Sequence, residues 1–226
     1  MKKHILMILP FFMFIYSCMG TNNKPIVDEN DSVELIVRPG ENWEGKRKIL
    51  VFTLKRTPQM AAWIEDYDNK YISTIIVTNK SAKKTWLKAP KEGRPEGLPV
   101  WNHKHQTASD SVDTENIDTV STATPKGSVL AKAGNDLLID GHVYNVFLEI
   151  NYAYDYNDFW TENNSDVNGQ PSLLYHAQFI AGLPDTIHLV PIGHGAVDGS
   201  NGNITYDLGN FTSALSIINE ASITAH

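Results

Sequence analysis

The chain has almost no cysteine, no surplus of basic residues and no apolar run long enough to cross a bilayer as a mature helix. Its 226 residues contain one cysteine, Cys18, so no disulfide can form within the chain. The 26 acidic residues outnumber the 19 basic ones, which gives a formal charge of −7. An acidic surface argues against nucleic acid and anionic lipid headgroups as partners, because both require a basic footprint.

The sequence also lacks the short motifs that identify common enzyme chemistries. It contains no Gly-x-Ser-x-Gly nucleophile elbow, no His-Glu-x-x-His zinc motif and no phosphate-binding loop. Glu149 and Asp155 fall on one face of a predicted strand, but six residues apart, which is too far for direct proton sharing. Catalysis therefore stays uncertain, and a non-catalytic protein is favoured.

The single cysteine follows a segment typical of a secretory signal. Lys2 and Lys3 precede an apolar run over residues 5–17, and Cys18 follows it immediately. Residues 14–18 resemble a bacterial lipobox, in which the cysteine is acylated and becomes the new N-terminus. The alternative is a signal peptide cleaved elsewhere, with an incidental cysteine.

These features predict an exported lipoprotein. We expect residues 1–18 to be the lipoprotein signal peptide. Residues 19–32 are polar and contain few core-forming side chains, so we expect them to be a flexible tether. Acylated Cys18 would anchor the protein to the lipid bilayer of a bacterial cell envelope, on its periplasmic or surface face.

The remaining residues, 33–226, show the pattern of an all-β domain. Short runs of β-branched and aromatic residues are separated by Gly, Pro, Asn and Asp. About eight strands at this spacing favour one immunoglobulin-like β-sandwich, with one or two short helices near residues 81–87 and 212–216. In residues 80–127, apolar and polar residues do not alternate with a regular period. We therefore expect a long irregular insert there, and such segments are often functional.

The longest strand is predicted over residues 144–157, where apolar and polar residues alternate. One face would pack on the core, and the other would carry a row of amides and carboxylates that must be hydrated or paired. We predict that this row holds the insert on the sheet. The predicted polar cluster consists of Glu149, Asn151, Asp155 and Asn157 on the strand, with Arg94, Trp101 and His103 in the insert.

Several segments, in the same order, resemble an uncharacterised family of predicted periplasmic proteins with a domain of unknown function. They are residues 63–66, 93–103, 118–125, 149–151, 155–157, 169–172 and 193–195, and the resemblance covers Lys48 to Ile223. It implies an immunoglobulin-like sandwich and export, without an assigned activity. Some members of the family occur beside flavin-transferase modules, which implies a link to extracytoplasmic electron transfer.

Two cofactor hypotheses follow from local patterns. Residues 118–124 resemble the acceptor sequence of flavin transferases, with Thr124 in the acceptor position, although Thr122 replaces a glycine and Pro125 follows. A Ser/Thr-rich turn explains the same residues.

The second hypothesis is a divalent metal held by His103, His105 and His194, in which His194 or alternatively His176 would complete the site together with Asp198 or Glu65. The alternative is a set of exposed or structural histidines.

The leading functional hypothesis is a membrane-anchored, non-catalytic binding or accessory module. Its partner, a protein or a small molecule, is not identified by the sequence. The first alternative is an accessory role in extracytoplasmic flavin-based electron transfer. The second is metal binding through the loop histidines.

Overall fold

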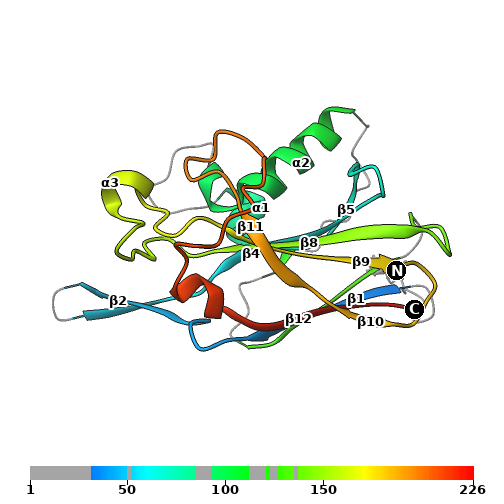
Figure 1. The fold of residues 1–226 in the computed structure, drawn as a ribbon, viewed down its shortest axis with the longest axis horizontal. Coiled ribbons are helices and arrows are strands. Elements are labelled where there is room, and N and C mark those ends of the chain that lie inside the picture. Colours follow the sequence, from blue (N-terminus) through cyan, green and yellow to red (C-terminus); the bar gives the residue numbers. More distant parts are fainter. Residues whose placement is uncertain (1–31, 50–51, 85–92, 112–120, 123–126, 135–136) are drawn as a thin grey trace, which may run out of the picture.

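The computed structural model describes residues 32–49, 52–84, 93–111, 121–122, 127–134 and 137–226. Two antiparallel sheets pack face to face, which confirms the expected β-sandwich (Figure 1). The first sheet has the order β10-β12-β1-β7. It consists of β1 (Ser32–Pro39), β7 (Val129–Gly134), β10 (Thr186–His188) and β12 (Ile218–Ala225).

The second sheet has the order β11-β9-β8-β4-β5, and the two-residue strand β6 (Ser121–Thr122) joins β5 in parallel. Its antiparallel strands are β4 (Gln59–Glu65), β5 (Tyr71–Thr78), β8 (Val143–Asn151), β9 (Leu173–Ile180) and β11 (Val190–His194). A separate hairpin consists of β2 (Gly45–Ile49) and β3 (Phe52–Arg56). The helices are α1 (Asn79–Lys83), α2 (Pro99–Ser111) and α3 (Glu162–Ser165), with 3-10 turns η1 (Pro95–Gly97) and η2 (Ser213–Ser216).

The main core lies between the two sheets. Alternate residues of β1 point into it, namely Val33, Leu35 and Val37, and all three are fully buried. Leu148 and Ile150 of β8 contribute from the opposing sheet. A period of two therefore places one apolar face of each sheet against the other, and burial of these faces is the main force that holds the sandwich together.

A second core covers the outer face of the second sheet. Trp63 of β4 and Phe147 of β8 are paired across the ladder, and their rings stack with centroids 5.3 Å apart. Val100 and Trp101 of α2 pack in the same cluster. The second sheet is thus the middle of three layers, with α2 lying on the side away from the first sheet (Figure 1). All seven residues of β4 are buried for this reason.

The long strand predicted over residues 144–157 is shorter than expected. β8 ends at Asn151, and Tyr154 adopts a left-handed backbone conformation with φ of 63°. The backbone N–H of Tyr154 donates to the Val167 carbonyl, and Asp155 forms an isolated bridge with Gly169. The alternation of residue types continues past Asn151, but contacts with residues 167–170 turn the chain away from the sheet.

The insert expected to be irregular contains the longest helix, α2, with thirteen residues. Pro99 occupies its first position, where the missing N–H costs no intrahelical hydrogen bond. Pro95 lies in η1 before the helix, and Pro99 begins it, so neither interrupts the helix. The helix-forming tendency of the sequence from Pro99 to Ser111 is modest, because it contains Asn, His, Thr, Ser and Asp.

Truncation of a buried strand residue should destabilise the sandwich. Leu148→Ala removes a fully buried side chain from the main core, and we expect the free energy of unfolding to fall by about 2–5 kcal/mol. Leu130→Ala, at a side chain that is 62% exposed, should change it by no more than about 0.5 kcal/mol. Urea denaturation measures both, and equal effects would contradict the assignment of the core.

Candidate functional site

A buried carboxyl group, that of Glu149, lies under the first turn of α2. The backbone N–H of Trp101 donates to Oε2 at 2.8 Å, and that of Val100 donates to Oε1 at 3.2 Å. The Ser172 hydroxyl donates to Oε1 at 2.6 Å. The first N–H groups of a helix have no partner within the helix, and a carboxylate also suits the positive end of its dipole. Glu149 therefore caps α2 from a strand that is distant in sequence.

The backbone of Gly195 closes the space around this carboxyl group. A Cβ atom at position 195 would lie 2.5 Å from Pro99, 2.7 Å from the Ser172 hydroxyl and 3.0 Å from Glu149 Oε1. The N–H of Gly195 also donates to the Ser172 carbonyl at 3.0 Å. Only glycine permits this close approach. The carboxyl group is therefore enclosed by the protein, and its oxygen atoms already accept three hydrogen bonds.

Burial determines the protonation of Glu149. The side chain is fully buried, and loss of hydration raises its pKa from 4.5 to about 7. The hydrogen bonds from Ser172, Trp101 and Val100 act in the opposite direction and lower the pKa. A carboxyl group that titrates near neutral pH is common in active sites. Here, however, the carboxyl group is enclosed, and its hydrogen bonds hold the first turn of α2 on the sheet.

Further polar contacts fix α2 along its length. Trp101 Nε1 donates to the Thr74 hydroxyl at 2.9 Å, which ties the helix to β5. One turn later, Lys104 Nζ lies 2.9 Å from Glu65 Oε2, and the other oxygen of Glu65 accepts a hydrogen bond from Trp63 Nε1 at 2.7 Å. Glu65 is almost fully buried, so its charge requires this pairing. The helix is thus held on the sheet at both its first and second turns.

A second polar network joins the loops beyond the end of β8. The two oxygen atoms of Asp155 accept hydrogen bonds from Ser213 at 2.8 Å and from Gln170 at 2.9 Å. Gln170 in turn accepts a hydrogen bond from the backbone N–H of Thr212 at 2.7 Å. Burial raises the pKa of Asp155, against the lowering effects of the Ser213 hydrogen bond and of nearby Arg56. This network connects residues 155, 170 and 212–213.

The predicted polar cluster is therefore divided in two. Of its strand residues, Glu149 contacts the insert, through Val100 and Trp101. Asn151 donates to the Gln170 carbonyl, and Asn157 donates to the Asn210 carbonyl, so both bind loops at the end of the sheet. Arg94 Nε forms an ion pair with Glu96 Oε1 at 2.6 Å within the insert.

The division follows from the end of β8 at Asn151, because Asp155 and Asn157 belong to the loop that follows it.

Sequence reasoning missed Ser172, Gln170 and the Glu65–Lys104 pair as members of these networks. Their residue types are common in any domain, and their partners lie far away in sequence. The structure nevertheless brings Glu149, Ser172 and Gly195, which are distant in sequence, into contact.

The three histidines proposed as metal ligands are not brought together as a site. His103 and His105 are two positions apart on α2, so their side chains leave the helix in different directions. His103 donates to the Gly199 carbonyl, the ring of His105 stacks on Trp101, and that of His194 packs against Trp160 and Phe211.

An extended chain would place His103 and His105 on one face, whereas the helix separates them. Within the described ranges, no set of three or more His, Cys, Asp or Glu side chains is arranged to hold a metal ion.

The candidates for covalent modification, Cys18 and Thr124, lie outside the described residues. Acylation at the first and a flavin at the second remain predictions. None of the helices in the described part of the chain is long and apolar enough to span a membrane. No protein-family model, curated protein or solved structure matches the chain.

The outer side of α2 and the loop of residues 195–203 form one accessible surface, which we call the α2 face. His103 Nε2 donates to the Gly199 carbonyl at 3.2 Å, and a Cβ atom at position 202 would lie 2.6 Å from the Cβ of His103. Gln106 and Thr107 are exposed on the helix. The loop contributes its own polar side chains, from Asp198, Ser200, Asn201 and Asn203. This surface is polar, and contacts with the sheet hold it in place.

Replacement of Glu149 should change how stability depends on pH. Because the pKa is raised in the folded protein, the fold favours the protonated carboxyl group. The contribution of this preference to the free energy of unfolding is complete below pH 4.5 and is lost as the pH rises through about 7. Glu149→Gln mimics the protonated form. We therefore expect the free energy of unfolding of the wild type, relative to this variant, to fall by about 3 kcal/mol between pH 4 and pH 8.

Urea denaturation of both proteins across this pH range tests the expectation. Glu162→Gln, a change at an exposed side chain of α3, is the matched control and should follow the wild type. Parallel curves for the wild type and Glu149→Gln would show that Glu149 does not titrate as described.

Proposed function

We propose that this protein is an exported lipoprotein, held on a bacterial cell-envelope membrane by acylated Cys18, which acts as a non-catalytic binding or accessory module. The observation that carries the non-catalytic part is the state of Glu149. It is the carboxyl group whose pKa burial raises to about 7, yet it is enclosed by Gly195 and accepts hydrogen bonds from α2 and Ser172. A group in this position reaches no substrate.

The binding surface in this proposal is the α2 face. Recognition residues commonly lie on segments that a rigid scaffold positions, because less freedom is then lost on binding. The α2 face meets this condition, since Glu149, Thr74 and Glu65 fix the helix on the sheet. Its polar character favours a partner that forms hydrogen bonds rather than one that buries a large apolar area.

Two features of the N-terminal segment support the anchor. A basic start and a short apolar run precede Cys18, and the polar residues 19–31 separate that cysteine from the first strand. Two or more acyl chains hold a protein firmly on a bilayer.

Acylation of Cys18 can be tested by the intact mass of the full chain expressed in a bacterium that processes lipoproteins. We expect a product that begins at Cys18 and carries acyl chains, recovered with the membrane fraction. Cys18→Ala should yield no acylated protein. The matched control combines Cys18→Ala with Thr21→Cys, which restores a thiol three positions away and should also lack acyl chains. An unmodified Cys18 in the wild type would contradict the anchor.

Site-specific photo-crosslinking in the native host tests the binding surface. We expect a photoreactive residue at Gln106, on the α2 face, to give a discrete adduct of higher mass. The same residue at Leu130, an exposed position of the first sheet, serves as the control and should give only background. If both positions give the same pattern, the α2 face is not the binding surface.

A further inference from the structure

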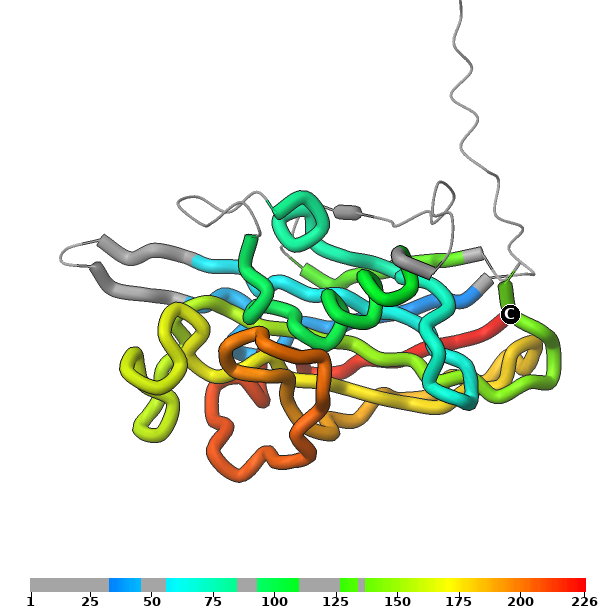
Figure 2. Tube along the Cα trace, turned by 90° about the horizontal axis from the view of Figure 1, so that it is seen from above, coloured from blue at the N-terminus to red at the C-terminus, as the bar shows by residue number. Residues whose placement is uncertain are grey.

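One end of the sandwich is defined by the start of β1. Ser32 pairs with Gly134 at the end of β7, and Val33 pairs with Ala225 at the end of β12. In the other sheet, Val143 pairs with Ile180, and the turn between β4 and β5 lies next to the start of β8. The turns at residues 66–70, 137–142 and 181–185 therefore lie at the end of the molecule where β1 begins. Figures 1 and 2 show this end beside the label C.

Apolar side chains concentrate on these turns and project into solvent. Of the ten large apolar side chains that are exposed in the described part of the chain, five lie here and are between 38% and 72% exposed. They are Tyr67, Leu137, Ile139, Ile180 and Leu183. We call this surface the apolar end. Isolated exposed apolar residues are ordinary, but a group of them at one place marks an interaction surface.

The turns of the apolar end are held in a defined arrangement. The N–H of Gly141 donates to the Ala181 carbonyl at 2.9 Å, and the N–H of Ala181 donates to the His142 carbonyl at 3.0 Å. The N–H of Ile139 donates to the buried Tyr144 hydroxyl at 2.8 Å. Two turns from different parts of the sequence are thus joined by hydrogen bonds. These hydrogen bonds therefore hold the turns that carry the apolar side chains in a defined position.

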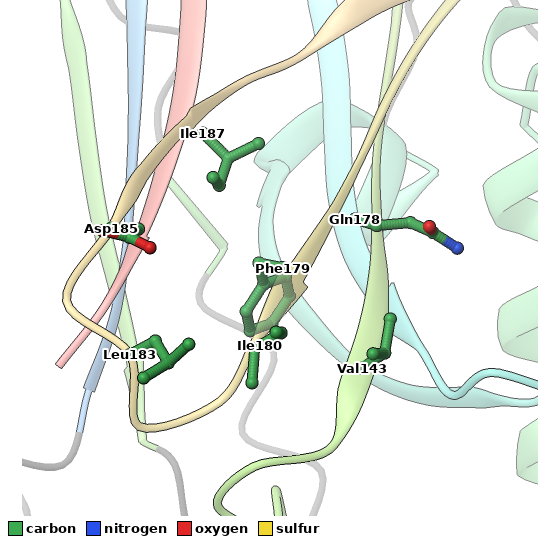
Figure 3. Close-up of a pocket in the computed structure, with 7 residues that line it drawn as sticks. All are labelled: Val143, Gln178, Phe179, Ile180, Leu183, Asp185 and Ile187. Atoms are coloured by element: carbon green, nitrogen blue, oxygen red, sulfur yellow. The ribbon is translucent and has the colours of Figure 1, made fainter.

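A hollow of about 270 Å³ lies within the same surface. Val143, Phe179, Ile180, Leu183 and Ile187 line it together with the polar Gln178 and Asp185, between the start of β8, the end of β9 and the start of β10 (Figure 3). Two of the exposed side chains, Ile180 and Leu183, therefore also form the wall of the hollow. The apolar end therefore includes a depression whose wall Ile180 and Leu183 share.

We propose that the apolar end rests on the lipid bilayer to which the protein is anchored. This inference depends on the proposed acylation of Cys18. Thirteen residues, 19–31, separate Cys18 from Ser32, and even fully extended they reach only about 45 Å. The end at which β1 starts therefore lies within about 45 Å of the membrane and is nearer to the anchor along the chain than any other part of the described fold. Leu and Ile enter the outer part of a bilayer favourably, and Tyr prefers its interface.

The charges around the apolar end define the kind of membrane. Asp66, Asp68, Asp140 and Asp185 lie on the same turns, where Lys70 is the one lysine or arginine. This excess of negative charge is repelled by anionic headgroups and tolerated by zwitterionic ones. We therefore expect contact through burial of apolar side chains, with weaker contact as the share of anionic lipid increases.

The lone native cysteine makes a direct test possible. Once Cys18 is acylated, a second cysteine introduced by substitution is the one free thiol, and a fluorophore can be attached there. We compare Leu183→Cys at the apolar end with Leu215→Cys, which has similar exposure in η2 at the opposite end of β12. The full-length acylated variants are reconstituted into phosphatidylcholine vesicles that contain spin-labelled lipid.

The label at position 183 should be quenched about threefold more strongly than the label at position 215, because only the former enters the interface. Leu137→Asp combined with Ile139→Asp should reduce this difference without releasing the protein from the vesicles. Addition of phosphatidylglycerol should reduce it as well.

Two outcomes would overturn the proposal. Equal quenching at both positions means that the apolar end does not contact lipid. Self-quenching between labels at position 183, without quenching by lipid, means that a second copy of the chain covers this surface instead. Flotation of the wild type with the vesicles separates both results from a failure of the anchor. A wild type that does not float shows that the proposed acylation itself is wrong.

Discussion

The structure depends on the placement of one carboxyl group, that of Glu149, at the start of α2. Helix α2 covers the outer face of the second sheet, where Trp63 and Phe147 would otherwise meet water. The first N–H groups of the helix are buried by the same contact, and without an acceptor each of them would cost about 1–3 kcal/mol. Glu149 supplies that acceptor from the sheet itself. The packing of α2 on the sheet therefore buries the second core and caps the helix at the same time.

This arrangement determines where function can lie. The polar side chains of the middle sheet are used to attach the outer layer and the loops, as the Glu65–Lys104 pair and the hydrogen bond from Asn151 to the Gln170 carbonyl illustrate. The accessible surfaces are consequently formed by other segments. The α2 face is polar and lies on the outer layer, whereas the apolar end lies where β1 begins. If the protein is tethered as proposed, these two surfaces can contact the membrane and a partner separately.

The sequence by itself determined the β-sandwich class and the buried faces of its strands. Alternate burial of Val33, Leu35 and Val37 follows from the residue types, because a period of two places them on one face. The sequence also identified Glu149 as a polar residue that must be hydrated or paired, and predicted that it pairs with the insert. It did not identify Ser172 or Gly195, whose roles come from contacts with residues far away in sequence.

Only the tertiary structure decided the state of the insert and the end of β8. The residues from Pro99 to Ser111 have a weak tendency to form a helix, and the acceptor that caps α2 lies 48 residues after Trp101. The helical state then separates His103 from His105, which an extended chain would have aligned. β8 ends where contacts with residues 167–170 compete with the sheet. In each case a long-range contact outweighs a weak local preference, and a single sequence does not reveal such contacts.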